Sequence, residues 1–233
     1  MPVKNILITG SSRGLGKEIA EHFLHSNCKV IGCSRSVSEI EHPNYRHFQV
    51  DVTSSDQVSN LFFELRKEIK HLDAVINNAG IASMNAFALT PVKTFQKIFN
   101  VNVQGTFLVC QKALGLLKRA PNPRIINMTT VAVPLQLEGE SIYAASKSAV
   151  ETLTRIIAKE FGGFGITCNA IGPSPIETDL IKGVPKEKIA ALVERQAVRK
   201  MATPADVINL VDFYLRPESS MISGQIIYLG GIF

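Results

Sequence analysis

Short apolar runs alternate along the chain with longer segments in which apolar residues recur at helical spacing. The apolar runs predict strands over residues 5–10, 29–34, 45–52, 73–80, 124–129, 166–171 and 225–229. The helical spacing predicts helices over residues 14–27, 54–72, 92–120, 141–161 and 205–215. Strands that are apolar on both faces alternate with helices. We therefore expect an α/β fold with a doubly wound, mostly seven-stranded parallel sheet and helices on both of its faces.

The same pattern predicts one domain. No linker rich in glycine, serine or proline divides the chain and no internal repeat is visible, so residues 1–233 are expected to fold as a single unit. The segment 173–200 carries three prolines and a glycine before it becomes helical. An interrupted segment of this kind after a buried strand is typical of a lid, which we place at about 175–200.

A glycine-rich loop joins the first predicted strand to the first helix. In "LITGSSRGLGKEIA", Gly10, Gly14 and Gly16 have the spacing G-x3-G-x-G. Gly10 suits a tight turn, Gly14 lets the backbone approach a pyrophosphate, and Gly16 lets the helix pack closely on the strand. The helix N-terminus favours negative charge. This loop, in its strand–helix context, predicts a Rossmann fold that binds a dinucleotide.

The end of the second strand indicates which dinucleotide is preferred. An NAD site commonly has an acidic residue there, whereas this chain has Ser34 and Arg35, and Arg13 lies within the glycine loop. Guanidinium groups bind phosphate through forked hydrogen bonds, so we expect NADP(H) to be preferred, with NAD(H) possible. A solvated surface position is the alternative explanation for Arg35.

Two further strand ends predict contacts with the same cofactor. Asp51 is suited to accept a hydrogen bond from the adenine amine, while Val52 packs on the ring. The "NNAG" segment places Asn78, Ala79 and Gly80 where the backbone must pass near the cofactor. The amides there could instead fix a turn, and the two roles are compatible.

The stretch "SIYAASKSAV" sets Tyr143 four residues before Lys147, which places both side chains on one face of a helix. The two residues are either solvent-exposed side chains without a chemical role or a pair that enables the tyrosine to act as an acid. The small residues between them would let a cofactor approach the helix.

Composition narrows the functional classes. With 45% hydrophobic residues, 19% charged residues and a net charge of +5, the chain is typical of a soluble globular protein. There is no long basic run, so nucleic-acid binding is not expected. The four cysteines have no metal-ligand spacing, so no metal site is expected and reduced thiols are favoured. No secretory signal or membrane-length apolar stretch is visible, so we expect a cytoplasmic protein without membrane contact.

Five motifs together resemble the short-chain dehydrogenase/reductase family over nearly the whole chain: "TGSSRGLG", "DV", "NNAG", "NVQG" and "YAASK". Within that family the chain is most similar to bacterial 3-oxoacyl-acyl-carrier-protein reductases. The resemblance implies an enzyme that uses a nicotinamide dinucleotide to interconvert a carbonyl group and an alcohol.

The resemblance also implies catalytic roles. Tyr143 is the general acid in reduction, and Lys147 binds the nicotinamide ribose. The Lys147 ammonium and an oxidised nicotinamide both favour the phenolate, so together they are expected to lower the pKa of Tyr143 toward working pH. Asn102 bends the long helix and holds a water that connects Lys147 to solvent. Thr130 stands where the family has a serine, and it retains a hydroxyl that can donate to the substrate carbonyl.

Further cofactor contacts implied by the resemblance fall at Ser12, Leu15, Pro173, Ile176 and Thr178. The chain departs from the family pattern at two more positions. Ser174, followed by a proline, replaces a glycine, so the loop after the sixth strand is expected to take a different path. Leu229 replaces an aspartate before the C-terminal glycine pair, so the subunit contact is expected to differ in detail.

These observations favour an NADPH-dependent carbonyl reductase for a small ketone such as a 3-oxoacyl thioester, as in fatty acid biosynthesis. A sugar, polyketide or secondary-metabolite ketone is the first alternative, and a dinucleotide-binding sensor or scaffold without turnover is the second. The predicted helices around Asn102 and Tyr143 are apolar on more than one face, which favours a homotetramer or homodimer.

The lid is expected to contribute to substrate recognition. Leu135, Leu137 and Ile181 suggest an apolar pocket wall. Three lysines of the lid could meet an anionic acyl carrier protein, although solvated surface is the simpler explanation for them: Lys182, Lys186 and Lys188.

Overall fold

A computed structural model describes residues 4–232, so positions 1–3 and 233 of the predicted domain lie outside the described residues. The strands are β1 (Asn5–Thr9), β2 (Lys29–Ser34), β3 (Tyr45–Gln49), β4 (Ala74–Asn77), β5 (Arg124–Met128), β6 (Thr167–Gly172) and β7 (Ile226–Tyr228). All neighbours are parallel, in the order β3-β2-β1-β4-β5-β6-β7. The predicted doubly wound, seven-stranded parallel sheet is therefore confirmed.

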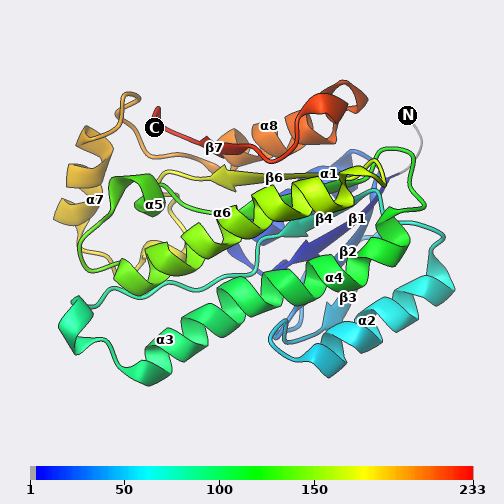
Figure 1. Cartoon of the computed structure of the whole chain (residues 1–233), viewed down its shortest axis with the longest axis horizontal. Coiled ribbons are helices and arrows are strands. Elements are labelled where there is room, and N and C mark those ends of the chain that lie inside the picture. The colour runs from blue at the N-terminus through cyan, green and yellow to red at the C-terminus, as the bar shows by residue number, and fades with distance from the viewer. Residues whose placement is uncertain (1–3, 233) are drawn as a thin grey trace.

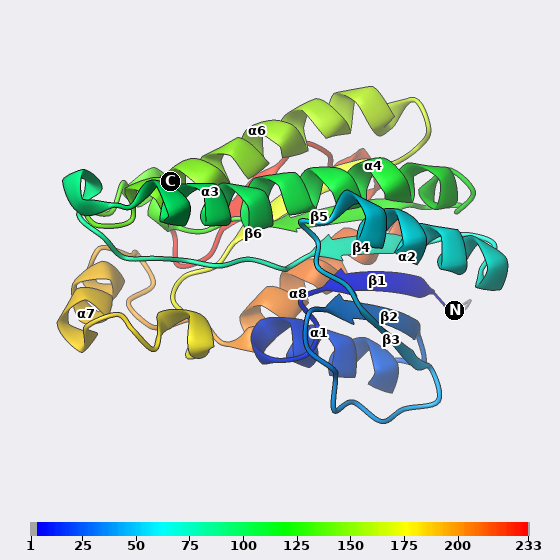
Figure 2. The ribbon, with the colours of Figure 1, turned by 90° about the horizontal axis from the view of Figure 1, so that it is seen from below.

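Helices cover both faces of this sheet (Figures 1 and 2). The α-helices are α1 (Gly14–His25), α2 (Ser55–Glu68), α3 (Val92–Phe99), α4 (Gly105–Leu117), α5 (Ala132–Leu135), α6 (Ser141–Gly162), α7 (Lys186–Glu194) and α8 (Pro204–Leu215). Single turns of 3₁₀ helix form η1 (Phe87–Leu89), η3 (Asp179–Ile181) and η4 (Pro217–Met221). Figure 2 shows α1 and α8 on one face and α2, α4 and α6 on the other.

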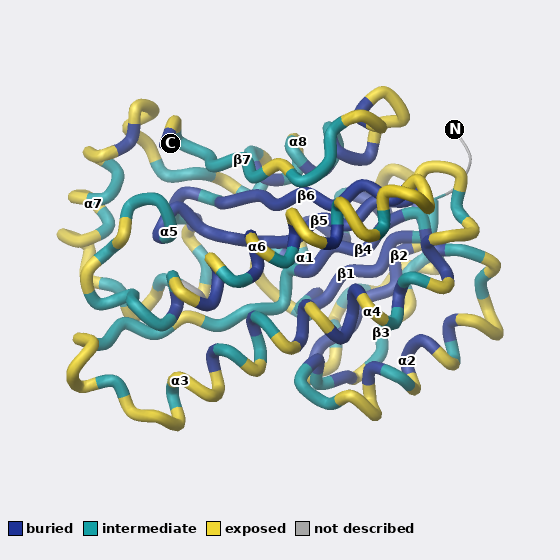
Figure 3. The backbone as a smooth tube through the Cα atoms, in the orientation of Figure 1, coloured by how far each residue is buried: buried dark blue, intermediate teal, exposed yellow. Residues whose placement is uncertain are grey.

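Each face of the sheet has its own hydrophobic core. On one face, Ile19 of α1 and Val207 of α8 pack against alternate residues of the strands. On the other, Phe62 of α2, Val109 of α4 and Ile157 of α6 pack against the remaining strand residues. Alternation along the central strands therefore feeds both cores. Figure 3 shows these central strands as deeply buried, whereas the edge strands β3 and β7 are only partly buried.

The long helix predicted over 92–120 runs from α3 into α4 through a π-helical segment, η2 (Asn100–Gln104). π-Helical turns are rare and are often found at functional sites. Asn102 lies in the middle of this segment and is fully buried. The helix that the sequence pattern predicts is thus present, with a local change of winding at the asparagine that the motif singled out.

The carboxyl ends of the strands face η1, α5 and α7, which gather at one end of the molecule (Figure 1). The segment predicted to be a lid, about 175–200, carries η3 and α7, and a parallel bridge between Ile176 and Ala202 ties its base to the chain after it. Two short elements near this edge, η1 and α5, were not expected from the sequence. Ligands of open α/β sheets bind at this edge, so the fold directs attention there.

Candidate active site

A cavity of about 490 Å³ opens at the carboxyl edge of the sheet. Its volume falls within the range of roughly 300–1,000 Å³ that is usual for small-molecule sites. The glycine loop and the ends of β2 and β4 line one part, and the chain after β5, helix α6 and the lid line the other. Eighteen of the twenty predicted cofactor and catalytic positions line this cavity, the exceptions being Gly16 and Asn102.

Gly16 lies behind the glycine loop and allows its close packing. A Cβ atom at this position would lie 2.2 Å from the carbonyl oxygen of Gly10 and 2.5 Å from Nδ2 of Asn78. The Asn78 amide donates to the carbonyl oxygens of Thr9 and Gly10, at 3.1 and 3.2 Å. Gly10 itself has φ +69°, a conformation that favours glycine. The loop is therefore held open and rigid from behind.

The cationic residues predicted for the adenosine end of a dinucleotide lie on the cavity side of this loop. Arg13 and Arg35 both line the cavity, beside Ser34 and Ser36 at the end of β2. The Ser34 hydroxyl donates to the carbonyl oxygen of Ser36 at 2.7 Å. Arg13 also forms an ion pair with Asp179 of the lid, at 3.5 Å. No acidic side chain of β2 lies at this end of the cavity within the described chain.

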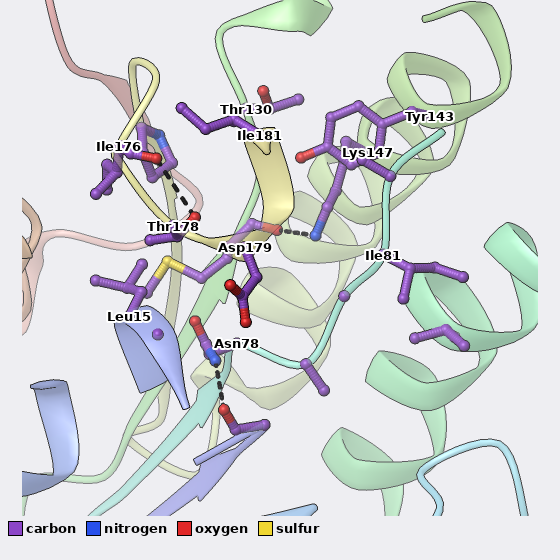
Figure 4. Close-up of a pocket in the computed structure, with 18 of the residues that line it drawn as sticks. Leu15, Asn78, Ile81, Thr130, Tyr143, Lys147, Ile176, Thr178, Asp179 and Ile181 are labelled. Atoms are coloured by element: carbon purple, nitrogen blue, oxygen red, sulfur yellow. Dashed lines mark hydrogen bonds between the residues drawn. The ribbon is translucent and has the colours of Figure 1, made fainter. Parts of the chain in front are cut away.

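Tyr143 and Lys147 occupy one face of α6 and are both buried, with exposed fractions of 7% and 5%. Figure 4 shows the two side chains next to each other in the cavity. The Lys147 ammonium donates to the carbonyl oxygen of Met128, the last residue of β5, at 2.8 Å. The alternative that Tyr143 and Lys147 are exposed surface residues is thus wrong, because both are buried and line the cavity.

Burial is the largest influence on the pKa values of this pair. Burial raises the pKa of Tyr143 to about 12, against a smaller lowering by the Thr130 hydroxyl and a further raising by Glu140. Burial lowers the pKa of Lys147 to about 8. Lys147 is not among the groups that shift the pKa of Tyr143 in the protein without cofactor. The lowering expected from Lys147 together with an oxidised nicotinamide therefore stays a prediction.

Thr130 lies in the loop between β5 and α5 and is buried beside Tyr143. Its hydroxyl oxygen accepts a hydrogen bond from the backbone N–H of Ala132 at 3.2 Å. That bond fixes the oxygen and leaves the hydroxyl proton free to be donated. The geometry therefore suits a group that donates to an oxygen atom in the cavity.

Asn102 supports the site from the π-helical segment. Its side chain accepts from the N–H of Ile81 at 2.9 Å and donates to the carbonyl oxygen of Ile81 at 3.0 Å and to the Ser146 hydroxyl at 2.9 Å. A Cβ at Gly80 would lie 3.3 Å from the Lys147 ammonium nitrogen and 3.4 Å from Oδ1 of Asn102. Gly80 therefore separates these two polar groups with the smallest possible residue.

Several lining residues were missed by the sequence reasoning. Glu140 precedes Tyr143 by one helical turn, and this spacing could have identified it, because residues three apart share a helix face. Val184 and Leu192 extend the apolar wall that Leu137 and Ile181 begin. Leu135 is not part of that wall.

Leu135 is the last residue of the short helix α5, which the pattern did not reveal, and it is not among the residues that line the cavity. Its carbonyl oxygen instead accepts a hydrogen bond from Arg195, immediately after α7. The lid is therefore tied to the loop that precedes α6.

The site fits a polar, dinucleotide-sized ligand. The hydroxyl of Ser174, which lines the cavity, is buried and has no hydrogen-bond partner among the described residues. A buried polar atom without a partner is costly, so a ligand that pairs with it would be stabilised. Among the described residues no group of His, Cys, Asp and Glu side chains could hold a metal ion, and no helix is long and apolar enough to cross a membrane.

Comparison with known proteins shows where this architecture recurs. Residues 10–231 match a family model described as enoyl-(acyl carrier protein) reductase. A 3-oxoacyl-[acyl-carrier-protein] reductase of Vibrio cholerae is 28% identical over 98% of this chain and 96% of its own length. An NADPH-dependent aldehyde reductase-like chloroplast protein of Arabidopsis thaliana is 31% identical over 97% and 92%.

A solved structure extends the comparison to the fold. The ligand-free aldohexose dehydrogenase of Thermoplasma acidophilum superposes with a TM-score of 0.89, at 29% identity, over 99% of this chain and 94% of that chain. The similar proteins thus share the fold and differ in the compounds that their names mention.

Proposed function

The chain belongs to the short-chain dehydrogenase/reductase family of oxidoreductases, and from this premise we propose that it is an NADPH-dependent carbonyl reductase. The observation that carries the proposal is the convergence of Tyr143, Lys147 and Thr130 on a cavity that continues to the glycine loop. A dinucleotide binder without turnover would have no need for a buried phenol beside a buried ammonium. The sensor alternative is therefore disfavoured.

The chain's own residues account for the proton transfer. When bound, the reduced nicotinamide supplies a hydride to the carbonyl carbon. Thr130 donates a hydrogen bond to the carbonyl oxygen, and Tyr143 transfers its hydroxyl proton to that oxygen, which gives the alcohol. With a pKa of about 12, Tyr143 is protonated at neutral pH, as an acid for reduction must be. Lys147 and Asn102 then relay a proton from solvent to the phenolate oxygen of Tyr143.

The preference for NADPH is supported by Arg13 and Arg35 at the adenosine end of the cavity and by serines where an NAD site commonly has a carboxylate. The test compares kcat/KM for NADPH and NADH in the wild type and in Arg35→Ala. We expect NADPH to be used at least tenfold better, with the preference reduced in the variant. Equal use of both cofactors by the wild type would contradict the preference.

The substrate is proposed to be a 3-oxoacyl thioester, with acyl carrier protein as its carrier, as in fatty acid biosynthesis. The apolar wall of Leu137, Ile181, Val184 and Leu192 and the names of several relatives support this class. The structural similarity to an aldohexose dehydrogenase and the pocket carboxyl of Glu140 favour a sugar as the second candidate.

Two assays separate these candidates. Oxidation of NADPH is followed with acetoacetyl-coenzyme A, and reduction of NADP⁺ is followed with aldohexoses. Rapid consumption of NADPH with the thioester, without turnover of aldohexoses, supports the 3-oxoacyl thioester. Turnover of aldohexoses without turnover of the thioester supports the sugar. A protein that binds NADPH but turns over neither the thioester, nor aldohexoses, nor other ketones would favour the dinucleotide-binding sensor.

The assembly is proposed to be a homodimer or homotetramer, and the location cytoplasmic. Phe107 of α4 and Ile156 of α6 expose 44% and 45% of their surface, which leaves apolar area for a second copy to cover. All four cysteines are free, which suits a reducing compartment. Light scattering of the purified protein tests the assembly, and a monomer at micromolar concentration would contradict it.

A further inference from the structure

The glycine loop and the lid are joined by a charged contact over the cavity. Nη1 of Arg13 lies 3.5 Å from Oδ2 of Asp179, the first residue of η3. The other carboxylate oxygen of Asp179 pairs with the Lys182 ammonium at 2.5 Å. Below this contact, Thr178 lies within 4.0 Å of where a Cβ of Gly14 would be. The base of the lid therefore rests directly on the loop predicted to hold phosphates.

Asp179 brings negative charge to a cavity that fits an anionic ligand. Its side chain points from the lid into the cavity in Figure 4, and it is one of the lining residues. The Lys182 and Arg13 cations lower the pKa of its carboxyl, so Asp179 is charged at neutral pH. A carboxylate beside a phosphate-binding loop repels the phosphates, unless its cationic partners are shared or it moves away.

Arg13 occupies the boundary between two hollows. It lines the main cavity together with Asp179, and it also lines an adjoining hollow formed with Ser12, Lys17, Ser36 and Glu39. Asp179 lines only the first of the two. The adjoining hollow lies next to Ser36, at the end of β2 where a ribose 2′-phosphate would be held. Arg13 and Ser36 line both hollows, so the carboxylate of Asp179 and a phosphate held beside Ser36 would share one guanidinium.

We propose that Asp179 is a specificity-determining residue that competes with the cofactor's 2′-phosphate for Arg13. The proposal rests on the NADPH preference proposed above. The phosphate carries more charge than a carboxylate and matches the guanidinium fork, so it displaces Asp179 and releases the base of the lid from the glycine loop. A dinucleotide without the 2′-phosphate leaves the contact in place. Cofactor identity and lid position are thereby coupled.

The size of the effect follows from the exposure of the pair. The two side chains are 76% and 48% exposed, so the ion pair is a weak one. Removing a competitor of that strength should tighten the binding of NADP⁺ by about two- to fivefold. The binding of NAD⁺ should change by less than this, because it lacks the group for which Arg13 is released.

The test is calorimetric titration of the purified protein with NADP⁺ and with NAD⁺. Four proteins are compared: wild type, Asp179→Asn, Arg13→Gln and the double variant. Glu177→Gln is the matched control, because it removes one negative charge from an exposed lid residue that makes no ion pair within the described chain. Asp179→Asn is expected to tighten NADP⁺ selectively, whereas Glu177→Gln leaves both affinities within the error of the titration.

The double variant identifies the route of the effect. If Asp179 acts through Arg13, Asp179→Asn changes NADP⁺ affinity only while Arg13 is present. Equal tightening of NADP⁺ and NAD⁺, or the same effect in the Arg13→Gln background, would overturn the competition. An unchanged affinity in Asp179→Asn would also overturn it. A wild type that binds neither dinucleotide would instead contradict the proposed function on which the inference rests.

Discussion

Replacing Gly16 by alanine tests how the glycine loop is built. The new Cβ would lie 2.2 Å from the Gly10 carbonyl oxygen and 2.5 Å from Nδ2 of Asn78, so the helix or the loop must move. Overpacking of this kind costs about 1–3 kcal/mol. Loss of the two hydrogen bonds that Asn78 donates adds about 0.5–1.5 kcal/mol each. Alanine recovers about 1 kcal/mol of helix propensity. The free energy of unfolding should therefore fall by about 1–5 kcal/mol.

Gly115→Ala is the matched control for this substitution. Gly115 also lies within a helix, α4, but a Cβ there would meet nothing within 4 Å. The same chemical change should raise the free energy of unfolding by about 0.5–1 kcal/mol, because only the propensity term applies. Both variants are measured by urea denaturation followed by circular dichroism. A Gly16→Ala protein as stable as Gly115→Ala would refute the close packing of Gly16 against Gly10 and Asn78.

Two further predictions concern the catalytic groups. Thr130→Val keeps the shape of the side chain and removes the hydroxyl, so kcat for ketone reduction should fall by about 10²–10³-fold. Thr130→Ser keeps the hydroxyl and should retain most of the activity. Equal activity in the two variants would exclude donation by the hydroxyl. Lys147 loses its charge as the pH rises through about 8, so kcat/KM should fall about tenfold per unit above that pH. The fall should be absent in Lys147→Met, and a wild-type profile that is flat to pH 10 would contradict the role of the ammonium.

The fold could be predicted from the sequence because period and composition are local properties. The buried strands and the amphipathic helices each have a clear repeat, and their alternation leaves few topologies. The family motif implied a bend at Asn102, but the apolar pattern did not reveal the π-helical segment, because Asn100–Gln104 changes the winding of the helix without interrupting that pattern. The helix α5 is too short to show a period.

The site was predictable where motifs are compact and not where it depends on tertiary contacts. The glycine loop and the Tyr143–Lys147 pair are each contained in a short stretch, and the structure brings both to one cavity. The raised pKa of Tyr143 comes from burial, which no local pattern reveals. The contact of Arg13 with Asp179 joins residues that are distant in the chain, so only the folded structure exposes it.

Tyr143 is proposed to donate the proton during reduction of a ketone by NADPH. The most direct test measures loss of reduced-nicotinamide absorbance with a 3-oxoacyl thioester at neutral pH, in the wild type and in Tyr143→Phe, together with calorimetric binding of NADP⁺ to both. We predict that the variant binds NADP⁺ within about twofold of the wild type but turns over at least about 10²-fold more slowly. Undiminished turnover in the variant would contradict the assignment of Tyr143 as the acid.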